Sequence, residues 1–125
     1  MDQSTLVENG HALINLLSEQ NMKPRAALWV TSPETGIWRL WIVPNKAAKD
    51  KYEFYKQIAE LISKNRANFS NLEISDIEYV PDTHPAIAAL RRMMKVTGNS
   101  VMVMQSSSFN GVFLPDSIIL EMDFE

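Results

Sequence analysis

Three segments of the chain repeat apolar residues at the three- and four-residue spacing of an amphipathic helix. The first begins at Ser4 or Thr5, either of which can cap it, and continues to about residue 20. The second covers about 50–66 and the third about 85–95. Each segment carries one apolar stripe, so we expect each helix to bury one face.

Shorter apolar runs predict the strands. Residues 26–32 and 37–43 lie on either side of the turn sequence 33–36 and should form a hairpin. A third strand is expected at 72–80, where the apolar positions change face near Ser75 and predict a bulge. A strand at 101–107 should return as a hairpin through the turn Asn110-Gly111, because both central residues of a type I′ turn need positive φ. The returning strand is expected at 112–114 and, after Pro115-Asp116, at 118–122.

The elements therefore follow the order α-β-β-α-β-α-β-β in one domain that covers residues 1–125. Two hairpins supply four of the five strands, which argues against a parallel doubly wound sheet. We predict an α+β fold with a five-stranded, largely antiparallel sheet and three helices packed mainly on one of its faces.

The first hairpin has two apolar faces. A four-residue turn pairs Val30 with Arg39 and Leu28 with Trp41, while Trp29 lies on the opposite face because side chains alternate along a strand. The face expected under the helices holds Ala27, Trp29, Thr31, Trp38, Leu40 and Ile42. The other face holds Leu28, Val30, Ile37, Arg39, Trp41 and Val43. A sheet face that meets water is normally polar, so this second face should be covered.

Three covers are open for the second face. A second copy of the chain ranks first, because Trp and Arg are enriched where interfaces bind most tightly, and Arg39, Trp41, Leu28 and Val30 are the interface candidates. Another segment of the same chain ranks second, with Arg39 extending to the rim. A ligand site ranks third, in which Arg39 holds an anion and Trp41 stacks on an aromatic ring.

Composition and charge exclude several functions. The chain has no cysteine, so disulfides, thiolate metal sites and cysteine nucleophiles are excluded. Its net charge of −3 argues against general nucleic-acid binding, although Lys46, Lys49, Lys51, Arg91, Arg92 and Lys95 could contact phosphates. The first residues lack the pattern of a secretion signal and no apolar run is long enough for a membrane span, so we expect a cytoplasmic protein.

One group of side chains could hold a metal ion. Asp76 and Glu78 share a strand face, and Asp82 and His84 follow at the next turn. Carboxylates with one imidazole suit Mg²⁺ or Mn²⁺. Helix capping by Asp82 or Thr83 accounts for the same residue types and is the preferred interpretation, so we expect no metal and no cofactor.

Three stretches resemble a family of small uncharacterised bacterial proteins with the same order of elements. They are Trp38-Arg39-Leu40-Trp41-Ile42, the segment LEISDIEYV followed by His84-Pro85-Ala86-Ile87, and FNGVFLPDSIIL. The resemblance implies the α+β fold and a bacterial origin, and it carries no activity. If Asp116 belongs to the shared pattern, it has a role that turn formation alone does not explain.

The leading hypothesis from the sequence is a non-enzymatic binding or interaction module that forms a homodimer through its sheet. A protein partner or a small anionic or aromatic ligand is the expected companion, with no membrane and no nucleic acid. The alternative is a small metal-dependent hydrolase that uses Asp76, Glu78, Asp82 and His84 on an anionic substrate.

Overall fold

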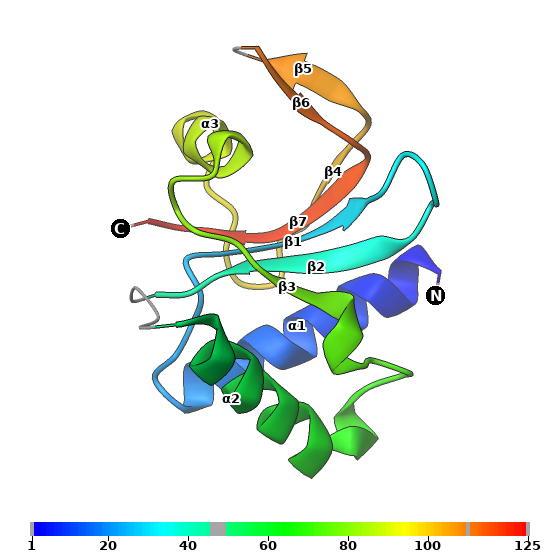
Figure 1. Cartoon of the computed structure of the whole chain (residues 1–125), viewed down its shortest axis with the longest axis vertical. Helices are drawn as coiled ribbons and strands as arrows, with labels where there is room; N and C mark the ends of the chain where they lie inside the picture. Colours follow the sequence, from blue (N-terminus) through cyan, green and yellow to red (C-terminus); the bar gives the residue numbers. More distant parts are fainter. Residues whose placement is uncertain (1, 46–49, 110, 125) are drawn as a thin grey trace.

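The structure is a computed structural model that describes residues 2–45, 50–109 and 111–124 (Figure 1). Three helices and seven strands alternate along these residues. The helices are α1 (Gln3–Glu19), α2 (Lys51–Lys64) and α3 (Pro85–Met93). The strands are β1 (Ala26–Thr31), β2 (Trp38–Val43), β3 (Ile77–Tyr79), β4 (Met102–Met104), β5 (Ser107–Phe109), β6 (Val112–Leu114) and β7 (Ser117–Met122).

The helices begin where a side chain can accept a hydrogen bond from the first turn. Asp2 caps α1, and its Oδ1 accepts from the backbone N–H of Thr5 at 2.8 Å, so the prediction of a cap at Ser4 or Thr5 is wrong by two or three residues. Asp50 caps α2 in the same way. His84 caps α3 through Nδ1, so the prediction of a cap at Asp82 or Thr83 is wrong by one or two residues. Pro85 follows at the first helical position, where its missing N–H costs nothing.

The main sheet has the strand order β3-β2-β1-β7-β4. β1 pairs antiparallel with β2, and the predicted register is confirmed, with Val30 opposite Arg39 and Leu28 opposite Trp41. β7 lies antiparallel on the other side of β1 and carries β4 at its far edge. β3 runs parallel to β2, so the five-stranded sheet is mixed and mostly antiparallel.

The fold is α+β, as predicted, with two differences in detail. The predicted strand 72–80 begins as a 3₁₀ turn at Ile74–Asp76, and only Ile77–Tyr79 pairs with the sheet. The turn produces the change of face that the sequence assigned to a bulge. The second hairpin divides in two, because β4 and β7 pair in the main sheet while β5 and β6 form a separate two-stranded sheet between them. Asn110 lies outside the described residues, and Gly111 has the expected positive φ of 75°.

The sheet is covered on both faces (Figure 1). α1 and α2 lie on one face, whereas α3 and the β5–β6 hairpin lie on the other. The helices are therefore divided two to one between the faces. The core under α1 and α2 contains the predicted hairpin residues Ala27, Trp29, Leu40 and Ile42. The opposite core contains Leu28, Val30 and Val43 together with side chains from α3 and β6.

Candidate functional site

The cover over the second hairpin face comes from the chain itself. Leu28 and Val30 are 0% and 4% exposed, and they share a core with Ile87 and Leu90 of α3 and Leu114 of β6. This arrangement is the second-ranked of the three covers considered from the sequence. Leu28 and Val30 offer no surface to a second copy or to a ligand, because their side chains are already buried.

Arg39 and Trp41 lie at the edge of this core and line a shallow groove. The groove has a volume of about 250 Å³ and is also lined by Val30, Ile37 and Glu78. Arg39 is engaged there, because its Nη2 donates to the carbonyl of Ile77 at 3.0 Å and its Nη1 lies 3.5 Å from Glu78 Oε1. An anion in the groove would therefore have to compete with Glu78 for the guanidinium.

Trp41 is half-buried and already has an aromatic neighbour. Its ring centroid lies 5.0 Å from that of His84, with the two planes tilted by 57°. The His84 ring is held in turn by its capping bond to the Ala86 N–H at 3.1 Å. The groove thus brings together Arg39, Trp41 and Glu78, His84 contacts it only through Trp41, and each of these side chains has a structural partner within the chain.

Asp82 pairs with a cation. Its Oδ2 accepts from Arg25 Nη1 at 3.0 Å, which ties the loop before α3 to the start of β1. Asp76 belongs to the 3₁₀ turn, where its Oδ2 accepts from the Glu73 backbone N–H at 2.9 Å. No group of three or more His, Asp or Glu side chains among the described residues could hold a metal ion. Within the described residues, the metal site that the hydrolase hypothesis requires is therefore not assembled.

Asp116 has the role that turn formation did not explain. Its Oδ1 accepts from both the backbone N–H and the hydroxyl of Ser106, at 2.8 and 3.0 Å. Its carbonyl accepts from the backbone N–H and hydroxyl of Thr31, at 3.0 and 2.7 Å. Asp116 thus joins the end of β1 to the corner where the chain leaves β4 for β5.

Glu121 is a buried carboxyl that the sequence reading did not single out. It lies in β7, where the register against β1 shifts between Ala27 and Leu28, so that two consecutive β7 side chains break the usual alternation. The Glu121 side chain is 1% exposed. Burial raises the pKa of the Glu121 carboxyl, and Lys23, whose Nζ lies 3.5 Å from Oε2, opposes that rise. The available signal was an acid inside the apolar run Ile-Ile-Leu-Glu-Met.

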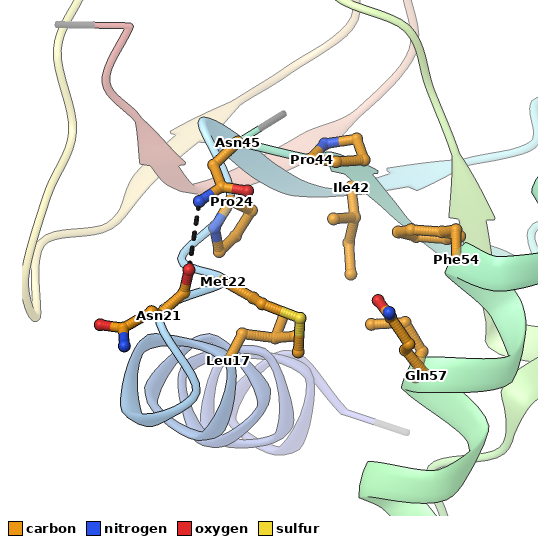
Figure 2. Close-up of a pocket in the computed structure, with 10 residues that line it drawn as sticks. Leu17, Asn21, Met22, Pro24, Ile42, Pro44, Asn45, Phe54 and Gln57 are labelled. Carbon is orange, nitrogen blue, oxygen red and sulfur yellow. Dashed lines mark hydrogen bonds between the residues drawn. The ribbon is translucent and has the colours of Figure 1, made fainter. Parts of the chain in front are cut away.

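A pocket between the two helices on the other face was also missed, because three separate segments form it. Figure 2 shows the end of α1, the end of β2 and the first turns of α2 meeting around it. We call it the α1–α2 pocket, and its volume is about 250 Å³. Its lining residues are Leu17, Asn21, Met22, Pro24, Ile42, Pro44, Asn45, Phe54, Gln57 and Ile58.

The β4 edge of the main sheet has three consecutive exposed apolar residues. Val101, Met102 and Val103 are 39%, 43% and 55% exposed. No Asp, Glu, Lys or Arg occurs from residue 96 to 115, so the whole segment that contains β4, β5 and β6 is free of charge. Within the described residues, β4 has β7 as its only strand neighbour.

Comparisons with protein-family models, curated proteins and solved structures found no match. The resemblance to a bacterial family therefore stays a prediction. Among the described residues, no helix has both the length and the apolar character needed to span a membrane. The basic residues considered for phosphate contact are only partly described, since Lys46 and Lys49 lie outside the described residues.

Proposed function

We propose that this chain is a non-enzymatic interaction module that pairs with a second copy of itself along β4. In this arrangement the β4 strands of two copies lie antiparallel about a two-fold axis. Two five-stranded sheets then become one continuous sheet. The observation that carries the proposal is the contrast between the two edges of the main sheet.

The β3 edge is closed by side chains. Val80 donates its N–H inward to the Ile42 carbonyl, so the groups of Ile77 and Tyr79 point outward by the alternation of a strand. The outward N–H of Tyr79 donates to the Tyr55 hydroxyl at 2.9 Å, and the outward carbonyl of Ile77 accepts from Arg39. These bonds leave little for another strand to pair with.

The β4 edge has none of the usual protections. Sheet edges are normally guarded by lysine, proline or inward-pointing charge, because an open edge pairs with other strands. β4 consists of Met102, Val103 and Met104, and the nearest charged residues in the sequence are Lys95 and Asp116. Val103 and Met102 lie on opposite faces of the strand, so both faces of the edge are apolar.

A second copy fits this edge better than a charged partner does. An antiparallel strand can pair with itself about a two-fold axis, and such isologous contacts are the commonest route to homodimers. The strand contributes three residues, so the contact area is small, and we expect a weak dimer whose population depends on concentration.

The test is the molecular mass in solution across a concentration series, measured by sedimentation equilibrium. We expect wild-type protein to shift from the mass of one chain to that of two as concentration rises. Val103→Lys should remain monomeric, because it places a charge at the centre of the paired edge. Met93→Lys is the matched control, since Met93 is 53% exposed against 55% for Val103 and lies on α3.

The proposal fails if wild-type protein stays monomeric at every concentration, or if Val103→Lys and Met93→Lys dimerise equally well. Circular dichroism of each variant establishes that the fold is intact before the masses are compared. A dimer that Met93→Lys alone disrupts would move the interface to α3.

A further inference from the structure

We infer that the α1–α2 pocket binds a small, uncharged heteroaromatic molecule that carries a carboxamide-like polar edge. The inference rests on the shape and chemistry of the pocket, and it does not depend on pairing through β4. The pocket lies under the sheet face that α1 and α2 cover, whereas β4 is at the far edge of the sheet.

The turn after α1 and the facing side of α2 form the walls of the pocket. α1 ends at Glu19, and Asn21 then adopts a left-handed conformation with φ of 59°, which lets the Met22 N–H donate back to the Leu17 carbonyl at 2.8 Å. The turn places Met22 and Leu17 on one side of the pocket (Figure 2). Phe54 and Gln57 of α2 stand opposite, and Ile42 of β2 lies between the two sides.

The lining favours an aromatic ring. Leu17, Ile42 and Ile58 are buried core residues and give the pocket an apolar base. Phe54 offers a ring for offset or edge contact, and the Met22 thioether on the opposite side can contact a second ring through its polarisable sulfur. A flat ligand inserted between them would gain both contacts at once.

The polar groups at the pocket favour a ligand without net charge. They are the side-chain carboxamides of Asn45 and Gln57 and the backbone carbonyl of Asn21, and the lining residues that the structure describes include no Asp, Glu, Lys or Arg. A carboxamide both donates and accepts hydrogen bonds, so it complements another amide edge. A charged ligand would lose its hydration there without gaining an opposite charge.

Asn45 shows how readily one of these groups could turn to a ligand. Its Nδ2 donates to the Asn21 carbonyl across the rim at 3.4 Å, which is a long bond (Figure 2). Exchanging this contact for one to a bound amide would cost little.

The volume limits the size of the ligand. An apolar cavity of about 150 Å³ holds benzene. The α1–α2 pocket, at about 250 Å³, has room for one ring with a polar substituent. Pockets for larger drug-like molecules begin at about 300 Å³. Nicotinamide has the expected size and character, and nicotinate replaces its amide by a carboxylate on the same ring, so the pair isolates the effect of charge.

The experiment is a titration of the isotope-labelled full chain with nicotinamide, followed by two-dimensional nuclear magnetic resonance. We expect saturable shifts in the backbone signals of Met22, Phe54 and Gln57 and in the carboxamide signals of Asn45 and Gln57. Nicotinate should bind about tenfold more weakly or not at all, because it brings an unpaired charge.

Two variants locate the binding. Gln57 is exposed on α2, so Gln57→Glu should fold normally and weaken nicotinamide binding about tenfold by removing an amide donor. Ser63→Glu adds the same charge on an exposed position of α2 outside the lining and should bind like the wild type. The inference is overturned if nicotinamide causes no saturable shifts, if the shifts lie elsewhere, or if nicotinate or Gln57→Glu binds equally well.

The Val103→Lys variant allows ligand binding and dimerisation to be tested independently. Val103→Lys should bind nicotinamide like the wild type, because Val103 is not part of the pocket. Loss of binding with dimerisation intact contradicts only the ligand inference. Loss of dimerisation with binding intact contradicts only the pairing along β4.

Discussion

Single residues decide how closely the layers of this protein approach one another. Gly10 of α1 faces the sheet, and a Cβ added there would overlap the Leu120 side chain and meet Trp29 Nε1 at 3.2 Å. The absence of a side chain lets α1 come close enough for Trp29 Nε1 to donate to the Leu6 carbonyl at 2.7 Å. The Trp29 indole is thus fully buried without leaving its N–H unpaired.

Glu121 is the residue at which burial and charge conflict. Burial raises the pKa of its carboxyl above the ordinary value of 4.5, so the folded chain binds this proton more tightly than the unfolded chain does. The contribution of Glu121 to stability is therefore most favourable below 4.5 and falls as pH rises through the raised pKa. Lys23 recovers part of the cost at neutral pH, and its own exposure keeps that ion pair weak.

We predict that Glu121→Gln stabilises the protein at neutral pH, because it removes the buried charge while keeping the shape of the side chain. The difference in the free energy of unfolding between variant and wild type should shrink as pH falls below the pKa of Glu121. Urea unfolding at a series of pH values measures this. A difference that is constant with pH, or a variant that is less stable at neutral pH, would contradict the account.

At the scale of elements, the corner between β4 and β5 shows how one side chain redirects a hairpin. Asp116 holds Ser106 and, through its carbonyl, Thr31 at the point where the chain leaves the main sheet. The β5–β6 hairpin can then fold back over the sheet and supply Leu114 to the core against α3. Without this fastening, the second sheet face would lose part of its cover.

We predict that Asp116→Ala destabilises the protein by about 1 kcal/mol, because two accepted hydrogen bonds are lost at an exposed carboxylate. Amide hydrogen exchange should become faster at Ser106 and in β5 and β6, and remain unchanged in β1 and β2. Asp116→Asn is the control, since its amide oxygen can still accept from Ser106. Uniformly faster exchange across the whole chain would show that the effect is global and not local to the corner.

The elements that the sequence predicts well are those whose signals are local. The register of β1 and β2 follows from a four-residue turn and strand alternation, and every predicted pair is present. Only Ile77–Tyr79 of the strand predicted at 72–80 pairs with the sheet, because a 3₁₀ turn occupies Ile74–Asp76 and the pairing is a parallel contact with β2 that no local pattern predicts. Likewise the sequence predicts one hairpin at Asn110-Gly111, but β4 pairs in the main sheet while β5 and β6 form a second sheet, and the hydrogen bonds of Asp116 lie at the corner between them.

The candidate site shows the same limit. The sequence predicts that the second face of the first hairpin is apolar and covered, and the burial of Leu28, Val30 and Val43 confirms it. Which segment covers this face depends on where α3 and β6 lie, and that is a property of the tertiary fold. The α1–α2 pocket draws its residues from three separate segments, 17–24, 42–45 and 54–58, so no motif in the sequence could reveal it.

At the scale of the whole molecule, the sheet is buried on both faces and its two edges are treated differently. α1 and α2 cover one face, and α3 with the β5–β6 hairpin covers the other (Figure 1). Tyr55 and Arg39 close the β3 edge by hydrogen bonds. The β4 edge carries no charged residue and is open to pairing with another strand, and this contrast is the basis of the proposed dimer.

Disulfide trapping tests this pairing most directly, because the natural chain has no cysteine and a single introduced thiol has no competitor. Two antiparallel β4 strands centred on Val103 would bring two Val103 Cα atoms to about 4.5–5.5 Å, within reach of a disulfide. The account predicts that Val103→Cys is oxidised rapidly to a covalent dimer, while Met93→Cys, equally exposed on α3, is oxidised far more slowly. Equal rates for the two variants would contradict pairing along β4.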